Sequence, residues 1–346
     1  MSLPLPYVDP DEPVFKGKTW DEIERVLTEK DAQALGMQGM DEDELGPRAG
    51  HPSKTMYSLF PWEMQVQGFS KPPKCSLETW SHACLKYTVT KQCANLTLSS
   101  GGSNALDLAM LDALQDAVVD LGQRKDVRVV LLRGEGKQFC SGFDPKYIMS
   151  ESSMEEQAVA SVQLQFARVL HALHRLPQYT IALLQGSALN AGLGLACVCD
   201  FVVAVKGAFF ALQDAKLGLV PSTSLPYILR RVPQLGRVTD LVLTAANLSA
   251  EQAKAAGLVD EVVDDAAALN AEAKSMCDKA TLCAPSAVKL TKEVVDNTVG
   301  QPPSSFLMGY VARSLAASRT TPEFRQGLEA VRGKKKPPWA QEPVVP

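Results

Sequence analysis

Short apolar runs alternate along the chain with longer segments in which apolar residues recur every three or four positions. A run that ends at a glycine or a charged residue is typical of a buried strand, and such runs occupy residues 127–132, 181–184 and 201–205. The helical spacing predicts helices at residues 108–121, 151–175, 193–199, 225–232, 236–243, 266–281, 284–295, 304–318 and 322–330. Strands that alternate with helices indicate an α/β fold, followed by a helical C-terminal region.

Two other patterns add strands to this outline. Residues 84–90 and 94–98 are short, largely apolar or alternating segments, and they predict an antiparallel hairpin. Ser249 is a predicted helix N-cap, and Gly257 is expected to end the helix that Ser249 opens. The apolar character returns at residues 261–263, which predicts a further strand after this helix.

The N-terminal segment has a different composition from the rest of the chain. Residues 1–50 hold 12 acidic and 5 basic residues, and the prolines near the start oppose regular structure. Only a short helix is predicted there, at residues 20–30. The expected organisation is therefore an N-terminal extension at residues 1–80, a core at residues 81–265 and a C-terminal helical region at residues 266–346.

Composition limits the classes of function. The 346 residues include 46% apolar and 21% charged residues, which is typical of a globular protein. No apolar run approaches the roughly 20 residues that a membrane-spanning helix needs. A net charge of -4 argues against binding of nucleic acid through a general basic surface. The eight cysteines lack the paired C-x-x-C spacing of a zinc site, and no secretory signal is visible. We therefore expect free thiols in an intracellular, reducing compartment, which could be the cytoplasm, the mitochondrion or the peroxisome.

Two of the predicted strands lead into tight, glycine-containing turns. Residues 181–184 reach Gly186, after which the small residues 187–192 predict a turn and then a helix. Residues 127–132 lead into residues 133–144 in a similar way. The first N–H groups of a helix have no partner within the helix and can bind a negative oxygen. Two such turns could present one N–H each to the same oxygen, although a turn without a ligand has the same local pattern.

Three ordered motifs give these turns a family resemblance. They are FCSGFDPK at residues 139–146, QGSALNAGLGLACVCD at residues 185–200 and FALQDAKLGLVPS at residues 210–222. In order and spacing they resemble the signatures of the enoyl-CoA hydratase/isomerase (crotonase) superfamily, and the resemblance covers roughly residues 87–339. It implies a spiral of ββα units, with the C-terminal helices forming a homotrimer or hexamer. It also implies a thioester of coenzyme A or of an acyl carrier protein as substrate, and no cofactor beyond the coenzyme A of the substrate.

The resemblance also assigns an oxyanion hole. Two backbone N–H groups would stabilise the enolate-like oxygen of a thioester, and by motif match they belong to Phe143 and Ala191. Gly142 and Gly192 would let the substrate approach the backbone closely. The neighbouring positions of the first motif, which would contact the substrate, are Cys140, Ser141, Asp144 and Lys146, and Lys146 stands where family members often contact coenzyme A.

The acid positions of the family distinguish several reactions. Hydratases of the family hold water between two glutamates, and these positions here are Gly194 and Asp214. A single carboxylate at the second position resembles the Δ3,Δ2-enoyl-CoA isomerases, in which one acid moves a proton from C2 to C4. A decarboxylase or other lyase, which needs only the oxyanion hole, is the alternative, and so is a non-catalytic acyl-CoA-binding protein. A glutamate placed at residue 194 would be expected to add weak hydratase activity.

Overall fold

The computed structural model describes residues 79–151, 153–232 and 234–340. By its internal contacts the chain divides into residues 1–70 and residues 71–346, and the account below concerns the second unit. The predicted N-terminal extension, with its helix at residues 20–30, lies almost wholly outside the described residues, so its role stays a prediction. The second unit contains both the predicted core and the predicted C-terminal helices.

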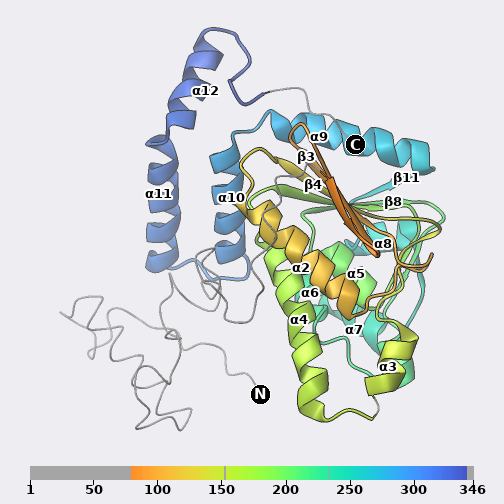
Figure 1. The fold of residues 1–346 in the computed structure, drawn as a ribbon. Helices are drawn as coiled ribbons and strands as arrows, with labels where there is room; N and C mark the ends of the chain where they lie inside the picture. The colour runs from red at the N-terminus through yellow and green to blue at the C-terminus, as the bar shows by residue number, and fades with distance from the viewer. Residues whose placement is uncertain (1–78, 152, 233, 341–346) are drawn as a thin grey trace, which may run out of the picture. The chain divides into compact units, whose positions relative to one another are not determined.

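A seven-stranded sheet forms the centre of the described fold (Figure 1). Its first three strands pair antiparallel with one another, and from the third strand onward neighbouring strands pair in parallel. In spatial order the strands are β1 (Thr79–His82), β2 (Leu85–Thr90), β3 (Cys93–Leu98), β4 (Val129–Gly134), β6 (Tyr179–Leu184), β8 (Phe201–Val205) and β11 (Glu261–Val263). The predicted hairpin and the four other predicted strands are confirmed. The apolar runs of β4, β6 and β8 are buried almost throughout, as parallel strands covered on both faces are, whereas β2 and β3 alternate between buried and partly exposed residues.

A second, four-stranded sheet follows the ends of the central strands. Its strands are β10 (Leu248–Ser249), β9 (Phe209–Ala211), β7 (Ser187–Leu189) and β5 (Gln138–Cys140), and β5, β7 and β9 come directly after β4, β6 and β8. The interpretation of residues 187–192 wholly as a turn was therefore wrong. A strand of three residues has too few positions to show alternation, and its pairing partners lie 22 or more residues away in sequence.

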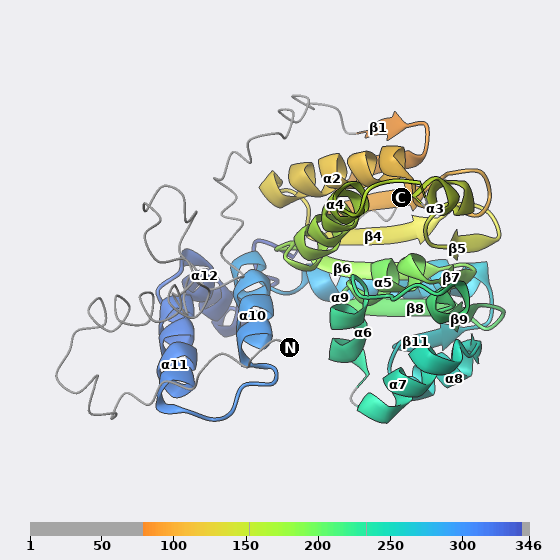
Figure 2. The ribbon, with the colours of Figure 1, turned by 90° about the horizontal axis from the view of Figure 1, so that it is seen from below.

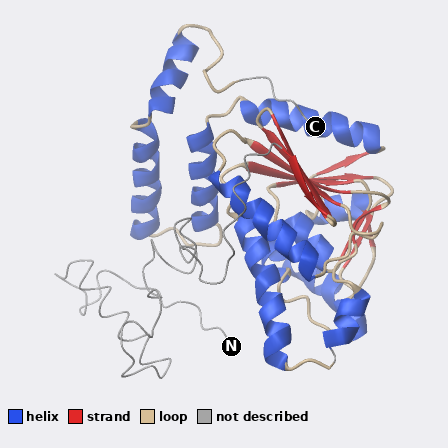
Figure 3. Cartoon of the chain, in the orientation of Figure 1, coloured by secondary structure: helices blue, strands red, loops and turns tan. Residues whose placement is uncertain are grey.

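Helices cover both faces of the central sheet. On one face α9 (Ala266–Thr281) packs on β4, β6 and β8, and Figure 3 shows it opposite the helices that follow β3 and β5. On the other face α2 (Leu108–Gln123) buries Leu111, Leu114 and Leu121, and it packs on α4 (Glu156–His174). No helix in the described part of the chain is long and apolar enough to cross a bilayer.

The predicted helix at residues 151–175 is wrong at its N-terminal end. The chain forms α3 (Pro145–Glu151) and then α4, which begins only at Glu156. Between them, Ser153 donates its backbone N–H and its hydroxyl to the carbonyl of Ser150, which closes a turn. Serine side chains compete with helical hydrogen bonds in this way, and the sequence pattern of apolar residues does not report it.

The remaining helices agree with the predicted segments within a few residues. α8 (Ala250–Ala256) has the capping box of Ser249 and Gln252, and Gly257 ends it in the left-handed conformation. The others are α5 (Ala191–Cys197), α6 (Leu225–Arg231), α7 (Leu235–Thr244), α10 (Pro285–Thr298), α11 (Ser305–Arg319) and α12 (Pro322–Arg332). The short 3-10 helix η1 (Asp214–Leu217) was not predicted. Figure 2 shows α10, α11 and α12 following one another outside the two sheets.

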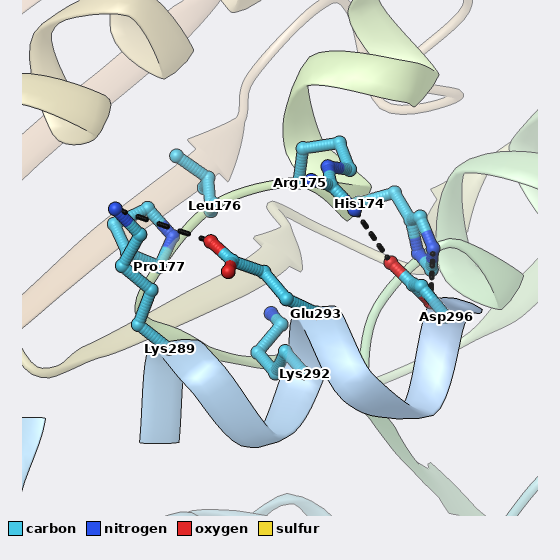
Figure 4. A pocket seen from close by; sticks show the side chains of 8 residues that line it. All are labelled: His174, Arg175, Leu176, Pro177, Lys289, Lys292, Glu293 and Asp296. Carbon is cyan, nitrogen blue, oxygen red and sulfur yellow. Dashed lines mark hydrogen bonds and ion pairs between the residues drawn. The ribbon is translucent and has the colours of Figure 1, made fainter. Parts of the chain in front are cut away.

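A partly buried ion-pair cluster fastens α10 to the core. Asp296 accepts hydrogen bonds from His174 at 3.1 Å, Arg175 at 3.2 Å and Arg230 at 2.7 Å, and its side chain is 11% exposed. Figure 4 shows Asp296 pointing toward His174 and Arg175 in the small pocket between α4 and α10. Burial opposes ionisation of Asp296, but the His174 hydrogen bond and the two arginine charges hold the pKa of this carboxyl below its ordinary range.

Removal of the Asp296 charge is expected to destabilise the fold. At neutral pH, Asp296→Asn should lower the free energy of unfolding by about 2 kcal/mol, because it weakens the charge-assisted hydrogen bonds from Arg175 and Arg230. The folded-state pKa is depressed, so the contribution is present above the unfolded pKa of about 3.9 and disappears as pH falls through the folded value. Urea unfolding at several pH values measures it. Asp278→Asn, which breaks the exposed Lys274 pair, is the control and should change stability by less than about 0.5 kcal/mol.

Candidate active site

Two amide side chains hold the loop between β4 and β5 in place. The Nδ2 group of Asn104 donates to the carbonyls of Glu135 at 2.9 Å and Gln138 at 2.8 Å. Gln185, which follows β6, accepts the N–H of Gly134 at 3.2 Å and donates to Gln138 at 2.7 Å. Because Asn104 is fully buried, these bonds are shielded from water. The loop that leads toward Phe143 is therefore fixed from both neighbouring strands.

The backbone around Phe143 is held so that its own N–H remains available. Leu106 donates its N–H to Gly142 at 2.8 Å and accepts the N–H of Asp144 at 2.9 Å. Phe143 lies between these two bonds, and its N–H has no hydrogen-bond acceptor in the part of the chain that the structure describes. Gly142 has a φ of +92°, which an L side chain rarely adopts. The first predicted donor thus has a fixed position and no internal partner.

The side chain of Phe143 reinforces this arrangement. Its ring meets the ring of Phe166 on α4 edge to face, with the centroids 5.2 Å apart. The ring of Tyr147 on α3 lies at 6.2 Å from it. Aromatic contacts of this kind are worth about 1 kcal/mol beyond the burial of area. The side chain therefore anchors the residue, while its backbone N–H has no acceptor among the described residues.

The second predicted donor is the first residue of α5. Ala191 occupies the N1 position, and among the described residues nothing accepts a hydrogen bond from its N–H. The preceding residue, Asn190, has φ 50° and ψ -124°, and its own N–H donates to Ala211 at 2.8 Å. The first N–H groups of a helix carry part of its positive end, so they favour a negative oxygen.

Close backbone contacts bring the two donor segments together. A Cβ placed on Gly142 would lie 3.3 Å from the nitrogen of Ala191 and 2.9 Å from the Cβ of Asn190. A Cβ on Gly192 would overlap the carbonyl oxygen of Cys140. A side chain at either glycine would collide with its neighbours, so only glycine fits at these two positions. The nitrogen of Ala191 lies against Gly142, the residue that precedes Phe143. The structure brings together residues that are about 50 positions apart in sequence.

The other residues of the first motif have mainly structural surroundings. Cys140 is fully buried, and burial raises the pKa of its thiol to about 12, so it is not a thiolate at neutral pH. Ser141 donates its N–H to Ser103 at 3.0 Å. Asp144 accepts the N–H of Lys146 at 2.7 Å and so caps α3. Lys146 itself is exposed, and its contact with coenzyme A stays a prediction.

Asp214 begins η1, immediately after β9, and has an unusual carboxylate. Its Oδ2 atom is buried, and no described residue hydrogen-bonds to it. Burial raises the pKa of this carboxyl, and the charge of a neighbouring side chain is not among the causes. A backbone hydrogen bond of Asp214 opposes this rise, but desolvation is the larger effect. A desolvated carboxylate with one unpaired oxygen is costly for folding but suited to accept a proton. Asp214 is thus a candidate base on grounds independent of its place in a motif.

The position of Gly194 is closed by a residue that the sequence did not indicate. A Cβ on Gly194 would overlap the hydroxyl of Ser224 and lie 2.6 Å from its Cβ. Ser224 is 3% exposed and precedes α6, so it comes from a different turn of the fold. The space in which a side chain of residue 194 would begin is therefore occupied. Because the two residues are 30 positions apart, no local pattern could have paired them.

Asn190 is the second residue that sequence reasoning missed. Its side-chain Oδ1 accepts the N–H of Gln213, the neighbour of Asp214, at 2.7 Å. It thereby connects the turn that precedes Ala191 to the segment that carries the candidate base. An asparagine directly before a predicted helix was a usable signal, because asparagine tolerates positive φ better than most residues.

Known proteins match most of this chain. The enoyl-CoA hydratase/isomerase family model matches residues 89–342. A Thermus thermophilus sequence is 32% identical over 239 residues, which are 68% of this chain and 90% of the relative. The human enoyl-CoA hydratase domain-containing protein 3, mitochondrial, is 29% identical over 253 residues, which are 72% of this chain and 81% of that protein.

Solved structures share the fold as well. Pseudomonas aeruginosa AtuE is 30% identical, with a TM-score of 0.72 over 75% of this chain and 100% of its own. An enoyl-CoA hydratase from Shewanella pealeana is 26% identical, with a TM-score of 0.71 over 74% of this chain and 96% of its own. The arrangement in which β4, β6 and β8 each continue into the second sheet and then into a helix is the expected ββα spiral. The chain belongs to the enoyl-CoA hydratase/isomerase family, the crotonase superfamily.

Proposed function

We propose that this protein is an enoyl-thioester isomerase that uses Asp214 as its single acid–base residue. The observation that carries the proposal is the buried, unpaired Oδ2 of Asp214, whose pKa burial raises. Family membership supports acyl-CoA as the substrate class. An acyl-carrier-protein thioester has the same reacting group, and the chemistry needs no cofactor beyond the thioester carrier.

The proposed reaction moves a double bond from the β,γ to the α,β position. The thioester carbonyl oxygen accepts hydrogen bonds from the N–H groups of Phe143 and Ala191. Asp214 removes a proton from C2, which gives a dienolate whose negative charge is spread onto that oxygen. The same carboxyl group then returns the proton to C4, and the double bond forms between C2 and C3. The aspartate ends the cycle ionised, so protons and charge balance.

The contact between Gly194 and Ser224 supports isomerisation over hydration. Two acids are needed to orient and split a water molecule, and residue 194 has no side chain to provide one of them. The neighbouring space holds the Ser224 side chain instead. The site therefore contains one carboxylate at the two acid positions of the family, and we infer that water addition is disfavoured for this reason.

A direct assay tests the proposal. Purified protein is incubated with a β,γ-enoyl-CoA in deuterium oxide, and the product is followed by mass spectrometry and proton NMR. The expected result is an α,β-enoyl-CoA that carries deuterium at C4 to the extent that Asp214 exchanges with solvent. A protein that binds the thioester but forms no product would contradict the proposal. Decarboxylation of a β-carboxyacyl-CoA in a parallel reaction would favour the lyase alternative.

Hydratase activity from a glutamate at residue 194 stays a prediction, and the contact with Ser224 adds a condition to it. Gly194→Glu alone should destabilise the protein by about 1–3 kcal/mol, because its Cβ overlaps Ser224 and overpacking of a buried site is unfavourable. The double variant Gly194→Glu with Ser224→Gly should recover most of this loss and hydrate an α,β-enoyl-CoA at a measurable rate. Thermal unfolding and a hydration assay are the measurements, with Ser224→Gly as control. A single variant as stable as the wild type would show that the site has more room than the contact indicates.

The C-terminal helices are the proposed site of self-association. Four apolar side chains on α11 and α12 are at least half exposed in the single chain, namely Met308, Leu315, Leu328 and Val331. Exposed apolar residues gathered on consecutive helices are typical of protein–protein interfaces. These residues support self-association through the C-terminal region, and the homotrimer or hexamer is the number of subunits that the family resemblance implies.

A further inference from the structure

We propose that Asn190 is a positioning residue that sets the geometry between the oxyanion-binding N–H groups and the Asp214 carboxylate. The inference rests on the proposed function, because it assigns both groups to one reaction. Asn190 contacts each of the three segments that form the site. Its backbone precedes Ala191, its Cβ lies against Gly142, and its Oδ1 accepts the N–H of Gln213 at 2.7 Å.

The backbone of Asn190 is held in a conformation that few residues adopt. At φ 50° and ψ -124° it lies outside the main allowed regions for L-residues, at a cost of about 1–3 kcal/mol. Three hydrogen bonds enforce it, since Asn190 donates to Ala211 at 2.8 Å and its carbonyl accepts from Leu193 at 3.0 Å and Gly194 at 3.3 Å. This conformation turns β7 abruptly into α5. It therefore decides the direction in which the N–H of Ala191 points.

The side chain of Asn190 acts on the other half of the site. No described residue holds the buried Oδ2 of the Asp214 carboxylate, so other bonds have to fix the segment from Gln213 to Asp214. One is the exposed bond from the Gln213 side chain to Asn247 at 3.3 Å, and the other is the bond from the Gln213 N–H. The bond from the Gln213 N–H to the Asn190 Oδ1 connects this segment to the turn that precedes Ala191. A backbone N–H can only donate, so the amide oxygen, and not the amide nitrogen, must face Gln213.

Residue 190 has to adopt an unusual backbone conformation and also supply a side-chain acceptor, and these two requirements together explain why it is an asparagine. Glycine would adopt the backbone conformation more easily, but it has no acceptor for Gln213. Alanine has neither the acceptor nor the tolerance of positive φ. Aspartate keeps the acceptor and tolerates the conformation. The three substitutions therefore separate the backbone role of residue 190 from its side-chain role.

The main experiment compares Asn190→Gly with Asn190→Asp. In Asn190→Gly, kcat for isomerisation should fall about 10–100-fold while KM changes by less than about threefold, because a displacement near 1 Å of the base is enough for such a loss. The carbonyl stretch of a bound, isotope-labelled acyl-CoA should keep its wild-type frequency, since both N–H donors remain. Asn190→Asp should restore most of kcat. Asn190→Ala should lose kcat and also disturb the carbonyl frequency.

A measurement without turnover separates this inference from the proposed function. The carboxyl pKa of Asp214 is read by carbon-13 NMR of labelled protein, with Asp214→Asn to assign the signal. In Asn190→Gly it should move down toward the ordinary aspartate value, because a released segment lets water reach the carboxylate. An unchanged Asp214 pKa, or a wild-type kcat in Asn190→Gly, overturns the positioning role. Absence of isomerase activity in the wild type overturns the proposed function alone.

Discussion

Asp214→Asn is expected to abolish isomerisation almost completely, with a decrease in kcat of about 10²–10⁴-fold. The amide keeps the volume of the carboxylate but cannot accept the C2 proton. Binding of the acyl-CoA should change little, because Asp214 acts on the reacting carbon and the thioester carbonyl is bound elsewhere. Steady-state kinetics with a β,γ-enoyl-CoA and calorimetric titration with a saturated acyl-CoA are the two measurements. An Asp214→Asn variant with wild-type kcat would exclude the single-base mechanism.

The same variant should be at least as stable as the wild type. Burial raises the folded-state pKa of Asp214, so any stabilisation from its protonated form is present below the unfolded pKa of about 3.9 and is lost as pH rises through the folded value. At neutral pH the buried charge is therefore a net cost, and the neutral amide removes it. Thermal unfolding at pH 7 should show an equal or higher midpoint. A large decrease in stability would instead indicate that Asp214 has a structural role.

The activity of the wild type should show the raised pKa directly. The proposed base works only when it is ionised, so kcat should decrease as pH falls through the pKa of Asp214 in the substrate complex. That apparent pKa should lie above the ordinary aspartate value. The pH dependence of kcat thus tests the assignment without any substitution.

Ala191→Pro is expected to decrease kcat by about 10²–10³-fold, because it removes one of the two proposed oxyanion donors. Proline is tolerated at the first position of a helix, where the lost N–H has no helical partner, and Ala191 occupies that position. Kinetic measurements with a β,γ-enoyl-CoA and a circular dichroism spectrum establish the activity and the fold. Ala191→Gly, which keeps the N–H, is the matched control and should retain most of the activity.

A spectroscopic measurement distinguishes loss of the donor from a disturbance of the turn by proline. The carbonyl stretch of a bound, unreactive acyl-CoA should lie at lower frequency than in solution, since two hydrogen bonds polarise the bond. In a folded Ala191→Pro variant this shift should be reduced. A folded variant with wild-type kcat and an unchanged shift would show that Ala191 is not a donor.

The sequence predicted the longer helices and strands well, since the spacing of apolar residues within a long segment identifies it without knowledge of its neighbours. The boundaries of α9 agree exactly with the predicted segment at residues 266–281, and β8 agrees with residues 201–205. The second sheet was missed because β5, β7 and β9 have three residues each, and their stability comes from pairing with one another. The break between α3 and α4 was missed because serine–backbone hydrogen bonds leave no periodic pattern.

For the site, the sequence located the two glycine turns and the acid position from their motifs. It could not show that Gly142 and Asn190 are in contact, because two separate strands bring them together. It also gave no measure of the environment of Asp214. A raised pKa and an unpaired oxygen depend on burial by residues that are distant in sequence.

The sequence by itself determined the family, the order of the longer strands and helices, and the absence of an acid at residue 194. Each of these follows from residue identity and local periodicity, which are properties of the chain alone. Tertiary structure decided that Ser224 fills the space beside Gly194, and that Asn190 joins the turn before Ala191 to the segment that carries Asp214. These contacts join residues 30 and 23 positions apart, and only the packing of separate ββα units brings such residues within hydrogen-bonding or van der Waals distance.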